Sequence, residues 1–298
     1  MSLFDQLVDE ALSRQQTLAP LRVVVEKELL HHDIFRVLSQ AGLLAQLTFV
    51  GGTCLRACYG SSRLSEDLDF TGGADFTRER LSAMARVLVQ SLQHKYGLGV
   101  AVSEPVRDEG NVSTWKLKVQ TRPGRKDMPV QRIHIDVCAV PSYQPRPMLL
   151  VNPYGVDMGT QGLIVQAQSR EEIFADKLVA FALRPNKIKN RDLWDMAWLH
   201  QQGIRPALEW LTQKLADHRA DPRPYLQSFD QRVQSLTTDK QTALDFRQEM
   251  SRFLPNAIVK ETVEAEPFWL YVADLMGSYG LQVRQALRAP APTPSFRM

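Results

Sequence analysis

The chain has 298 residues, of which 44% are hydrophobic and 23% are charged, and its formal net charge is +3. This is the composition of an ordinary folded protein, and so small a net charge does not by itself indicate a nucleic-acid partner. The three cysteines provide no disulfide framework, the first residues lack the features of a signal peptide, and no apolar run approaches the ~18 residues of a membrane-spanning helix, so we expect a cytoplasmic protein.

The first part of the chain mixes helical and strand patterns. Apolar residues at helical spacing predict helices over residues 3–16, 21–41 and 77–96. Strand patterns occur at residues 47–50, 67–71, 100–103, 113–120 and 130–137. Polar loops join the later strands at 107–111 and 122–126, and a Pro-rich connection follows over 141–153.

From residue 169 the pattern is helical throughout. Helices are predicted over residues 169–184, 190–203, 206–217, 236–253 and 267–287. We therefore expect an α+β fold in which a mixed sheet with flanking helices is followed by a helical C-terminal domain. The predicted divisions are an α/β domain with N-terminal helices over 1–165, a helical domain over 166–288 and a Pro-rich, disordered tail over 289–298.

A Gly-Gly-Thr turn follows the first predicted strand. Gly51 and Gly52 allow a sharp turn and a close approach of the backbone to a phosphate. Thr53 is expected to cap the next helix, whose N-terminal N–H groups attract anions. The segment predicts a phosphate-binding turn, although two glycines alone more often form a turn with no ligand.

Acidic residues on the following strands are candidate metal ligands. In a strand, Asp67 and Asp69 would share one face, roughly 7 Å apart at the backbone, with Leu68 and Phe70 facing the core. Mg²⁺ prefers a few carboxylates together with phosphate oxygens. Asp136, in a β-branched strand, would be a third ligand, and the three together would hold two metal ions for in-line attack on a phosphorus. Each acid alone is more often solvated or salt-bridged.

Two other enzyme classes share part of this pattern. The sequence DLDFT over 67–71 fits the Asp-x-Asp-x-Thr of haloacid-dehalogenase-type phosphatases, but there the nucleophile closes an apolar run, whereas residues 61–66 are largely polar. Asp-x-Asp also occurs in glycosyltransferases, which do not require the upstream Gly-Gly turn. The turn and the acids together favour metal–nucleotide chemistry over both alternatives.

A second charged cluster lies in the helical part. Lys177 occupies a turn of an apolar helix, where a lysine is more often a surface residue whose stem packs on apolar neighbours. The loop 184–191 is rich in cations. Asp192 and Asp195 open the next helix, where acids also interact favourably with the helix dipole, so their position has a structural explanation too.

The order of these elements resembles the AbiEii/AbiGii (MenT-like) nucleotidyltransferase toxins of the DNA polymerase β-like superfamily. The resemblance covers roughly residues 45–200 and rests on Gly-Gly-Thr, Arg-x-Ser-x-Asp-Leu-Asp-Phe, Ile-x-Ile-Asp, a helical Glu-x-x-x-x-Lys and Arg-Asp-x-x-Asp. Such proteins are toxins of bacterial toxin–antitoxin or phage-defence pairs, and characterised members transfer nucleotides to tRNA 3′ ends. The implied fold is a nucleotidyltransferase-type sheet, with the helical domain completing the active site.

The resemblance also implies roles for individual residues. Asp67, Asp69, Lys177 and Asp192 would be catalytic. The metal ligands would be Asp67, Asp69 and Asp136, the last being a carboxylate whose use varies between members. The nucleotide would be bound by Gly51, Gly52, Thr53, Arg63, Ser65 and Lys177.

We therefore expect a Mg²⁺- or Mn²⁺-dependent enzyme that transfers a nucleoside monophosphate from an NTP to RNA, with the tRNA 3′ end as acceptor and an antitoxin encoded by an adjacent gene. The basic loops 122–126 and 184–191, with Trp194 and Trp198 nearby, are either RNA contacts or a solvated surface beside core tryptophans. The alternatives are transfer to a protein hydroxyl or a small molecule, and a catalytically idle nucleotide-binding protein. The sequence does not indicate which NTP or RNA is used.

Overall fold

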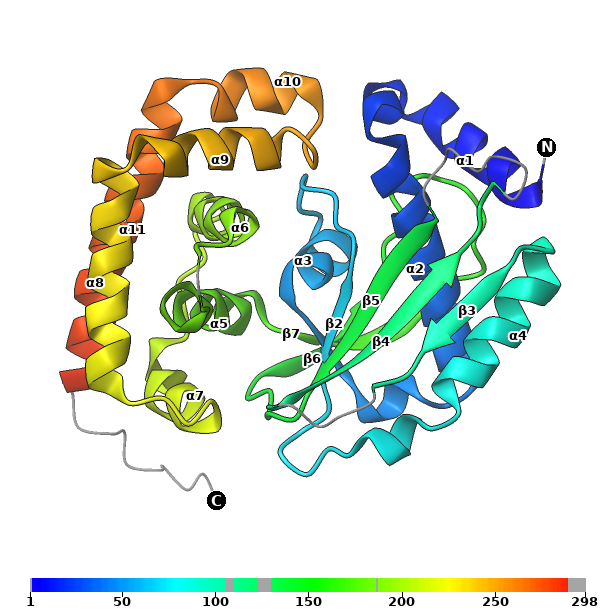
Figure 1. Ribbon diagram of the computed structural model, residues 1–298, viewed down its shortest axis with the longest axis horizontal. Coiled ribbons are helices and arrows are strands. Elements are labelled where there is room, and N and C mark those ends of the chain that lie inside the picture. Colours follow the sequence, from blue (N-terminus) through cyan, green and yellow to red (C-terminus); the bar gives the residue numbers. More distant parts are fainter. Residues whose placement is uncertain (1, 106–109, 123–129, 186, 289–298) are drawn as a thin grey trace. The chain divides into compact units, whose positions relative to one another are not determined.

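The computed structural model describes residues 2–105, 110–122, 130–185 and 187–288 (Figure 1). They form two compact units, one of residues 1–169 and 253–256 and the other of residues 170–252 and 257–298. The first unit is therefore not one continuous stretch of chain. Most of the predicted loops at 107–111 and 122–126, and the whole predicted tail over 289–298, lie outside the described residues.

The first unit contains all the strands that the structure describes. They are β1 (Thr48–Val50), β2 (Leu68–Thr71), β3 (Val100–Ser103), β4 (Val112–Val119), β5 (Gln131–Cys138), β6 (Pro145–Leu149) and β7 (Ile164–Gln168). Its helices are α1 (Leu3–Arg14), α2 (Arg22–Gln40), α3 (Gly51–Tyr59) and α4 (Met84–Tyr96). Within the described residues, no helix of the chain is long and apolar enough to cross a membrane.

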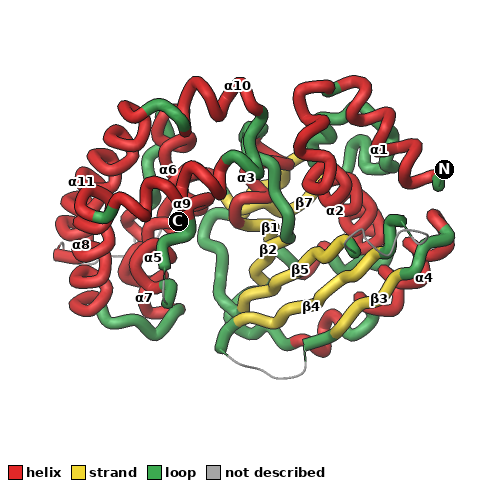
Figure 2. Tube along the Cα trace, turned by 45° about the horizontal axis from the view of Figure 1, so that its top comes forward, coloured by secondary structure: helices red, strands yellow, loops and turns green. Residues whose placement is uncertain are grey.

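These strands form one seven-stranded sheet in the order β3-β4-β5-β2-β1-β7-β6. Figure 2 labels this order from β3 to β7. The β2–β5 and β1–β7 pairs are parallel and the others antiparallel, so the predicted mixed sheet of an α+β fold is confirmed. Helices α2 and α4 pack together against the sheet. Because β2 lies between β1 and β5, the strand that follows the Gly-Gly turn is next to the strand that carries Asp136.

An aromatic cluster fixes the centre of this sheet. Phe49 of β1 pairs in register with Phe70 of β2, and both rings contact Phe35 of α2, at centroid distances of 4.8 and 5.8 Å. All three side chains are buried. Such ring pairs contribute about 0.5–1.5 kcal/mol each beyond the burial of their area, so they hold the two short strands next to the turn in one register.

The second unit is helical. It contains α5 (Arg170–Leu183), α6 (Asn190–Gln201), α7 (Leu211–Asp217), α8 (Pro222–Thr238), α9 (Lys240–Met250) and α11 (Glu266–Arg288). The short α10 (Asn256–Ile258) begins at the last residue of the first unit. Aromatic contacts between Phe174 and Tyr279 and between Phe181 and Phe229, both at 4.9 Å, join α5 to α11 and to α8.

Several of the predicted elements differ in the structure, and the predicted helix over 206–217 is a 3₁₀ turn, Leu208–Trp210, followed by α7. Of the predicted helix over 236–253, the first residues are the end of α8, which begins at Pro222 and was largely missed, and Asp239 caps α9 by accepting the Gln241 N–H. The predicted helix over 77–96 is a 3₁₀ turn, Arg78–Leu81, followed by α4. The Pro-rich connection contains β6, which lies at the edge of the sheet, where proline is tolerated because one side of the strand needs no N–H donors.

Candidate active site

The Gly-Gly turn becomes the first turn of α3. Gly51 opens the helix with φ of +76°, and Val50 before it provides no side-chain cap, so the first N–H groups of α3 keep the bonding capacity that an anion can use. A Cβ atom on Gly51 would lie 2.9 Å from Oδ2 of Asp69. Glycine is therefore required here both by the backbone conformation and by the close approach of an acidic side chain.

Thr53 does not cap α3, and the sequence prediction on this point is wrong. Its side chain is buried, and its hydroxyl lies 2.6 Å from the Ser65 hydroxyl and also donates to the carbonyl of Asp67. The helix begins two residues before Thr53, so its hydroxyl cannot reach the first free N–H groups. Thr53 instead fastens the loop before β2 to α3.

The three candidate acids lie near one another at the middle of the sheet. Asp69 is directly opposite Asp136 in the parallel β2–β5 pairing, and Leu68 and Phe70 on either side of Asp69 are buried. Asp67 precedes the first residue of β2, and its Oδ1 accepts the His134 N–H of β5 at 3.0 Å. The predicted arrangement on adjacent strands is therefore present, with Asp67 just outside the strand.

The chemistry of these acids fits a divalent metal held together with phosphates. Oδ1 of Asp136 is buried and has no hydrogen-bond partner among the described residues, an orphaned acceptor of the kind that a cation satisfies. Within the described residues, no group of three or more His, Cys, Asp or Glu side chains forms a metal site on its own. Mg²⁺ commonly takes one or two carboxylates and completes its shell with substrate phosphates, which agrees with this partial set.

Two further predicted nucleotide ligands are buried in the loop before β2. Arg63 is 3% exposed and its Nη1 donates to the carbonyl of Leu64 at 3.0 Å. Ser65 is 5% exposed, and its N–H donates to Glu28 of α2 at 2.8 Å. Both side chains therefore form hydrogen bonds that hold the loop in place.

In the second unit, Lys177 is buried within an ion cluster. Its Nζ lies 2.7 Å from Oδ1 of Asp192 and 2.8 Å from Oδ2 of Asp195, and Arg184 contacts the other oxygen of Asp192 at 3.2 Å. Lys177 is thus not a surface lysine, because only 6% of it is exposed. Asp195, which the sequence did not mark as a site residue, is fully buried and shares the same ammonium.

Asp192 is held as a carboxylate by this cluster. Burial opposes its ionisation, but the positive charges of Lys177, Lys189 and Arg184 outweigh burial and hold the pKa of its carboxyl well below the usual range. The cluster therefore presents a paired ammonium and an ionised acid at the start of α6. Asp67, Asp69 and Asp136 belong to the first unit, and Lys177 and Asp192 to the second.

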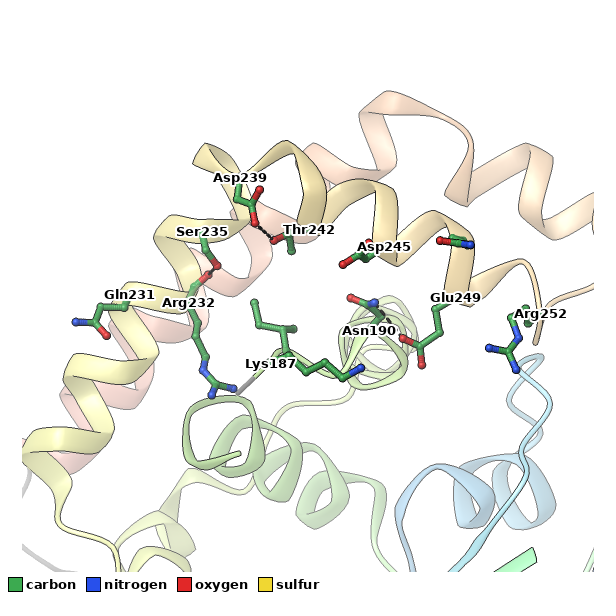
Figure 3. A pocket seen from close by; sticks show the side chains of 12 residues that line it. Lys187, Asn190, Gln231, Arg232, Ser235, Asp239, Thr242, Asp245, Glu249 and Arg252 are labelled. Carbon is green, nitrogen blue, oxygen red and sulfur yellow. Dashed lines mark hydrogen bonds between the residues drawn. The ribbon is translucent and has the colours of Figure 1, made fainter. Parts of the chain in front are cut away.

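A polar cavity of about 730 Å³ lies in the second unit, between α6, α8, α9 and the loop before α6 (Figure 3). Its lining carries both signs of charge, including Lys187, Arg232 and Arg252 on one hand and Asp239, Asp245 and Glu249 on the other. Asn190 donates to Glu249 across it at 3.0 Å. The cavity has the volume of a small-molecule site, and most of its lining residues carry hydrogen-bonding groups.

Several of the candidate RNA contacts have structural roles, since Arg184 pairs with Asp192 and Arg191 with Glu249. Arg122 donates to the buried carboxylate of Glu26, so its charge is used inside the first unit. Trp194 is 5% exposed and packs against Phe268 at 5.6 Å, as a core residue does. The rest of the predicted basic loop over 122–126 lies outside the described residues.

Solved structures of other proteins are similar to the chain. The chain is similar to the nucleotidyltransferase toxin MenT4 of Mycobacterium tuberculosis, with a TM-score of 0.56 and 17% identity over 96% of this chain and 98% of the other, which shows a common fold. It is also similar to JHP933 of Helicobacter pylori, with a TM-score of 0.49 and 15% identity over 89% and 95% of the two chains. No curated protein sequence matches the chain.

The sequence also matches a family model. The model describes the family "Nucleotidyl transferase AbiEii toxin, Type IV TA system", and the match covers residues 32–269, most of both units. This span contains the Gly-Gly turn, the acids of β2 and β5 and the Lys177 cluster. The chain belongs to the AbiEii family of nucleotidyltransferase toxins of type IV toxin–antitoxin systems.

Proposed function

We propose that this nucleotidyltransferase moves a nucleoside monophosphate from an NTP to the end of an RNA, with the tRNA 3′ end as acceptor, in a reaction that requires Mg²⁺ or Mn²⁺. The observation that carries the proposal is the position of Asp69, which lies against Gly51 at the start of α3 and opposite Asp136 on β5. A phosphate-binding helix start and a pair of carboxylates are thereby side by side. That is what a metal–triphosphate complex needs.

The acids have distinct tasks in this proposal. Asp67 and Asp69 hold the metal, and Asp136 supplies the third carboxylate on the side of the attacking hydroxyl. A bound divalent ion supplies positive charge that neutralises the triphosphate and lowers the pKa of that hydroxyl. The acceptor hydroxyl loses its proton to solvent water and its oxygen bonds to the α-phosphorus, while the bond from that phosphorus to the bridging oxygen breaks and pyrophosphate leaves.

The remaining residues bind and orient the nucleotide. The N–H groups of Gly51 and Gly52 bind phosphate oxygens, while Thr53 and Ser65 hold the loop that carries the acids. Lys177 offsets charge on the triphosphate and the pyrophosphate, and Asp192 keeps that ammonium charged and fixed in position. Arg63, whose side chain is buried, supports the loop before β2 rather than contacting the substrate.

The support for an RNA acceptor is the cationic loop before α6. Lys187 is exposed and lines the polar cavity next to it, where a nucleotide of the acceptor would find amide, hydroxyl and guanidinium groups. These cations do not favour a cationic small molecule. The family's toxin–antitoxin description implies a cognate antitoxin, and we place it in an adjacent gene.

The direct test is to incubate purified protein with total RNA and each α-labelled NTP, with and without EDTA. Wild type should label an RNA band with at least one NTP, and EDTA should abolish the label. Asp69→Asn should transfer nothing, whereas Asp75→Asn, a change to an exposed acid paired with Arg80, should match wild type. Label on protein instead of RNA would identify a protein hydroxyl as the acceptor, and full transfer by Asp69→Asn would contradict the metal assignment.

The acceptor contacts can be tested through salt dependence. RNA binding should weaken steeply as salt rises, and Lys187→Glu should reduce the slope of log affinity against log salt by about 1. The control is Lys260→Glu, which reverses the charge of another exposed lysine that does not line the cavity. Lys189 is unsuitable for this test because its charge also lowers the pKa of Asp192. Equal slopes for Lys187→Glu and wild type would remove this loop from the RNA site.

A further inference from the structure

Helix α2 holds the loop that leads to the metal-binding acids. Oε1 of Glu28 accepts the Ser65 N–H at 2.8 Å, and Nζ of Lys27 lies 2.8 Å from the carboxylate of Glu66. One turn further along α2, Nε2 of His31 lies 3.0 Å from the Glu66 carbonyl, which can only accept, so Nε2 carries the proton. Three side chains of one helix face therefore bind the two residues that directly precede Asp67.

The loop needs such support because it has no regular structure of its own. Residues 60–67 form neither helix nor strand, so no ladder of backbone hydrogen bonds fixes them. The loop is held from α3 by the Thr53 hydroxyl, which reaches Ser65 and Asp67. It is held from α2 by Glu28, whose hydrogen bond fixes the Ser65 backbone.

Glu28 also binds the helix that carries the Gly-Gly turn. Its two carboxylate oxygens lie 3.3 and 3.2 Å from Nε of Arg56 on α3, and Oε2 in addition accepts the hydroxyl of Tyr154. Arg56 in turn donates to the Ser61 carbonyl at the start of the loop, at 2.9 Å. With 4% of it exposed, Glu28 is a buried carboxylate whose partners come from the loop, from α3 and from Tyr154.

We propose that Glu28 is a positioning residue for nucleotidyl transfer: by accepting the Ser65 N–H it fixes the Ser65–Asp67 backbone to α2, so that the acids keep their place beside the phosphate-binding turn. This inference rests on the proposed roles of Asp67 and Asp69. The physical reason is that catalysis is sensitive to small displacements, since a shift of about 1 Å can lower a rate by about 10²-fold. Glu28 lies well outside the segment in which the sequence revealed the site.

Two substitutions at Glu28 separate positioning from simple charge pairing. Glu28→Gln keeps an oxygen at the right distance to accept the Ser65 N–H but loses the charge opposite Arg56. Glu28→Asp keeps the charge but is one methylene too short to reach Ser65. Positioning predicts that Glu28→Asp lowers kcat at least tenfold and raises the Mg²⁺ concentration for half-maximal rate, with Glu28→Gln closer to wild type. The reverse order would show that only the ion pair to Arg56 matters and would overturn the proposal.

The matched control is Glu26→Gln on the same helix. Glu26 is equally buried and binds Arg22, Arg122 and Gln131, none of which belongs to the loop. The Glu26→Gln variant should lower thermal stability as the Glu28 variants do, but it should leave kcat and the Mg²⁺ requirement within twofold of wild type. Equal loss of kcat in Glu26→Gln and Glu28→Asp would reduce Glu28 to a stabilising residue.

The same variants are informative even if RNA is not the acceptor. Binding of each Mg²⁺–NTP to full-length protein, measured by its effect on thermal unfolding, does not depend on the acceptor. If wild type labels no RNA, the proposed acceptor fails, while weaker Mg²⁺–NTP binding by Glu28→Asp than by Glu26→Gln still supports positioning. If the Asp69→Asn variant binds and transfers as wild type does, the metal assignment fails and this proposal fails with it.

Discussion

At the scale of single residues, the site depends on close approaches that only particular side chains allow. Gly51 combines a left-handed backbone with an acidic side chain 2.9 Å from where its Cβ would be. Lys177 is shared by two carboxylates, one of them fully buried. Each arrangement can be tested against a residue of the same kind that lacks the functional contact.

Gly51→Ala should lower the unfolding free energy and the transfer activity by more than the strain of a left-handed backbone alone explains. Gly60, the residue after α3, has the same φ of +76° and no atom within 4 Å of where its Cβ would be, so Gly60→Ala should cost about 1 kcal/mol of unfolding free energy. Gly51→Ala carries that penalty plus steric displacement of Asp69, of about 1–3 kcal/mol. Chemical unfolding and transfer assays of both variants would check this. Equal stability and equal activity of the two would show that Asp69 is free to move.

Asp195→Asn should lower both stability and NTP use. Breaking a buried ion pair costs roughly 3–5 kcal/mol, and we expect a loss near 3 kcal/mol because Asp192 still pairs with Lys177. A less firmly held ammonium should then raise KM for the NTP. The control is Asp33→Asn, which removes a fully buried acid paired with Lys95 and Arg36. It should lose stability with unchanged KM, and the same KM in both variants would make Asp195 a packing residue only.

At the scale of elements, α2 is unusual because charged and titratable side chains are buried along most of its length. Glu26, Glu28, His31, His32 and Asp33 are all at most 5% exposed. Each is satisfied by a specific partner, as His32 is by the Thr160 hydroxyl at 2.9 Å. A helix built in this way holds its surroundings by directed bonds, and it makes the stability of the first unit depend on pH.

His32 should make the fold sensitive to mild acid. Burial, followed by the charges of His31, Arg56 and Lys95, lowers the pKa of His32 to about 3. Its stabilising contribution is complete above the unfolded pKa of about 6.5 and is lost as pH falls towards 3, by up to about 1.4 kcal/mol per pH unit. Between pH 7.5 and 5, His32→Gln should therefore lose about 2 kcal/mol less unfolding free energy than wild type.

The comparison needs denaturant unfolding at both pH values. His94, an exposed histidine on α4, provides the control, because His94→Gln should leave the wild-type pH dependence unchanged. A His32→Gln variant with the full wild-type loss at pH 5 would show that His32 does not carry this dependence.

At the scale of the whole molecule, family membership makes a prediction for the cell. A toxin that modifies tRNA ends would block aminoacylation, so induced expression without an antitoxin should stop growth. Asp69→Asn, expressed to the same level, should permit growth. The measurement is a growth curve for both strains together with labelling of extracted RNA. Equal growth of the two strains, with no nucleotide added to any RNA, would favour a different acceptor.

Local sequence patterns predicted most of this molecule. The strand–turn–helix unit and the adjacent strands of Asp69 and Asp136 follow from periodicity and from glycine chemistry, and the structure places them as expected. The pattern failed at β6, where Pro145 and Pro147 resemble a loop but are compatible with the edge of a sheet. It also assigned Thr53 a capping role that the helix start at Gly51 excludes.

The residues that hold the site in place could not be predicted from local sequence patterns. Glu28 precedes Ser65, the residue that it holds, by 37 residues, and nothing in its neighbourhood distinguishes it from Glu26. Asp195 resembles any acid near the start of a helix until its ion pair with Lys177 is seen. Such residues act through contacts distant in sequence, which spacing alone does not reveal.

Residues 253–256 belong to the first unit although the residues on both sides of them belong to the second, and this limits how related genes can recombine. The Phe253 carbonyl accepts the Leu64 N–H at 2.9 Å, three residues before Asp67, and the side chains of Phe253 and Leu254 are buried. A crossover between related genes near codon 169 would take the loop over residues 60–67 from one parent and residues 253–256, which bind it, from the other. We therefore expect exchange among natural variants to keep these two stretches in the same parental combination, even where the intervening helices differ.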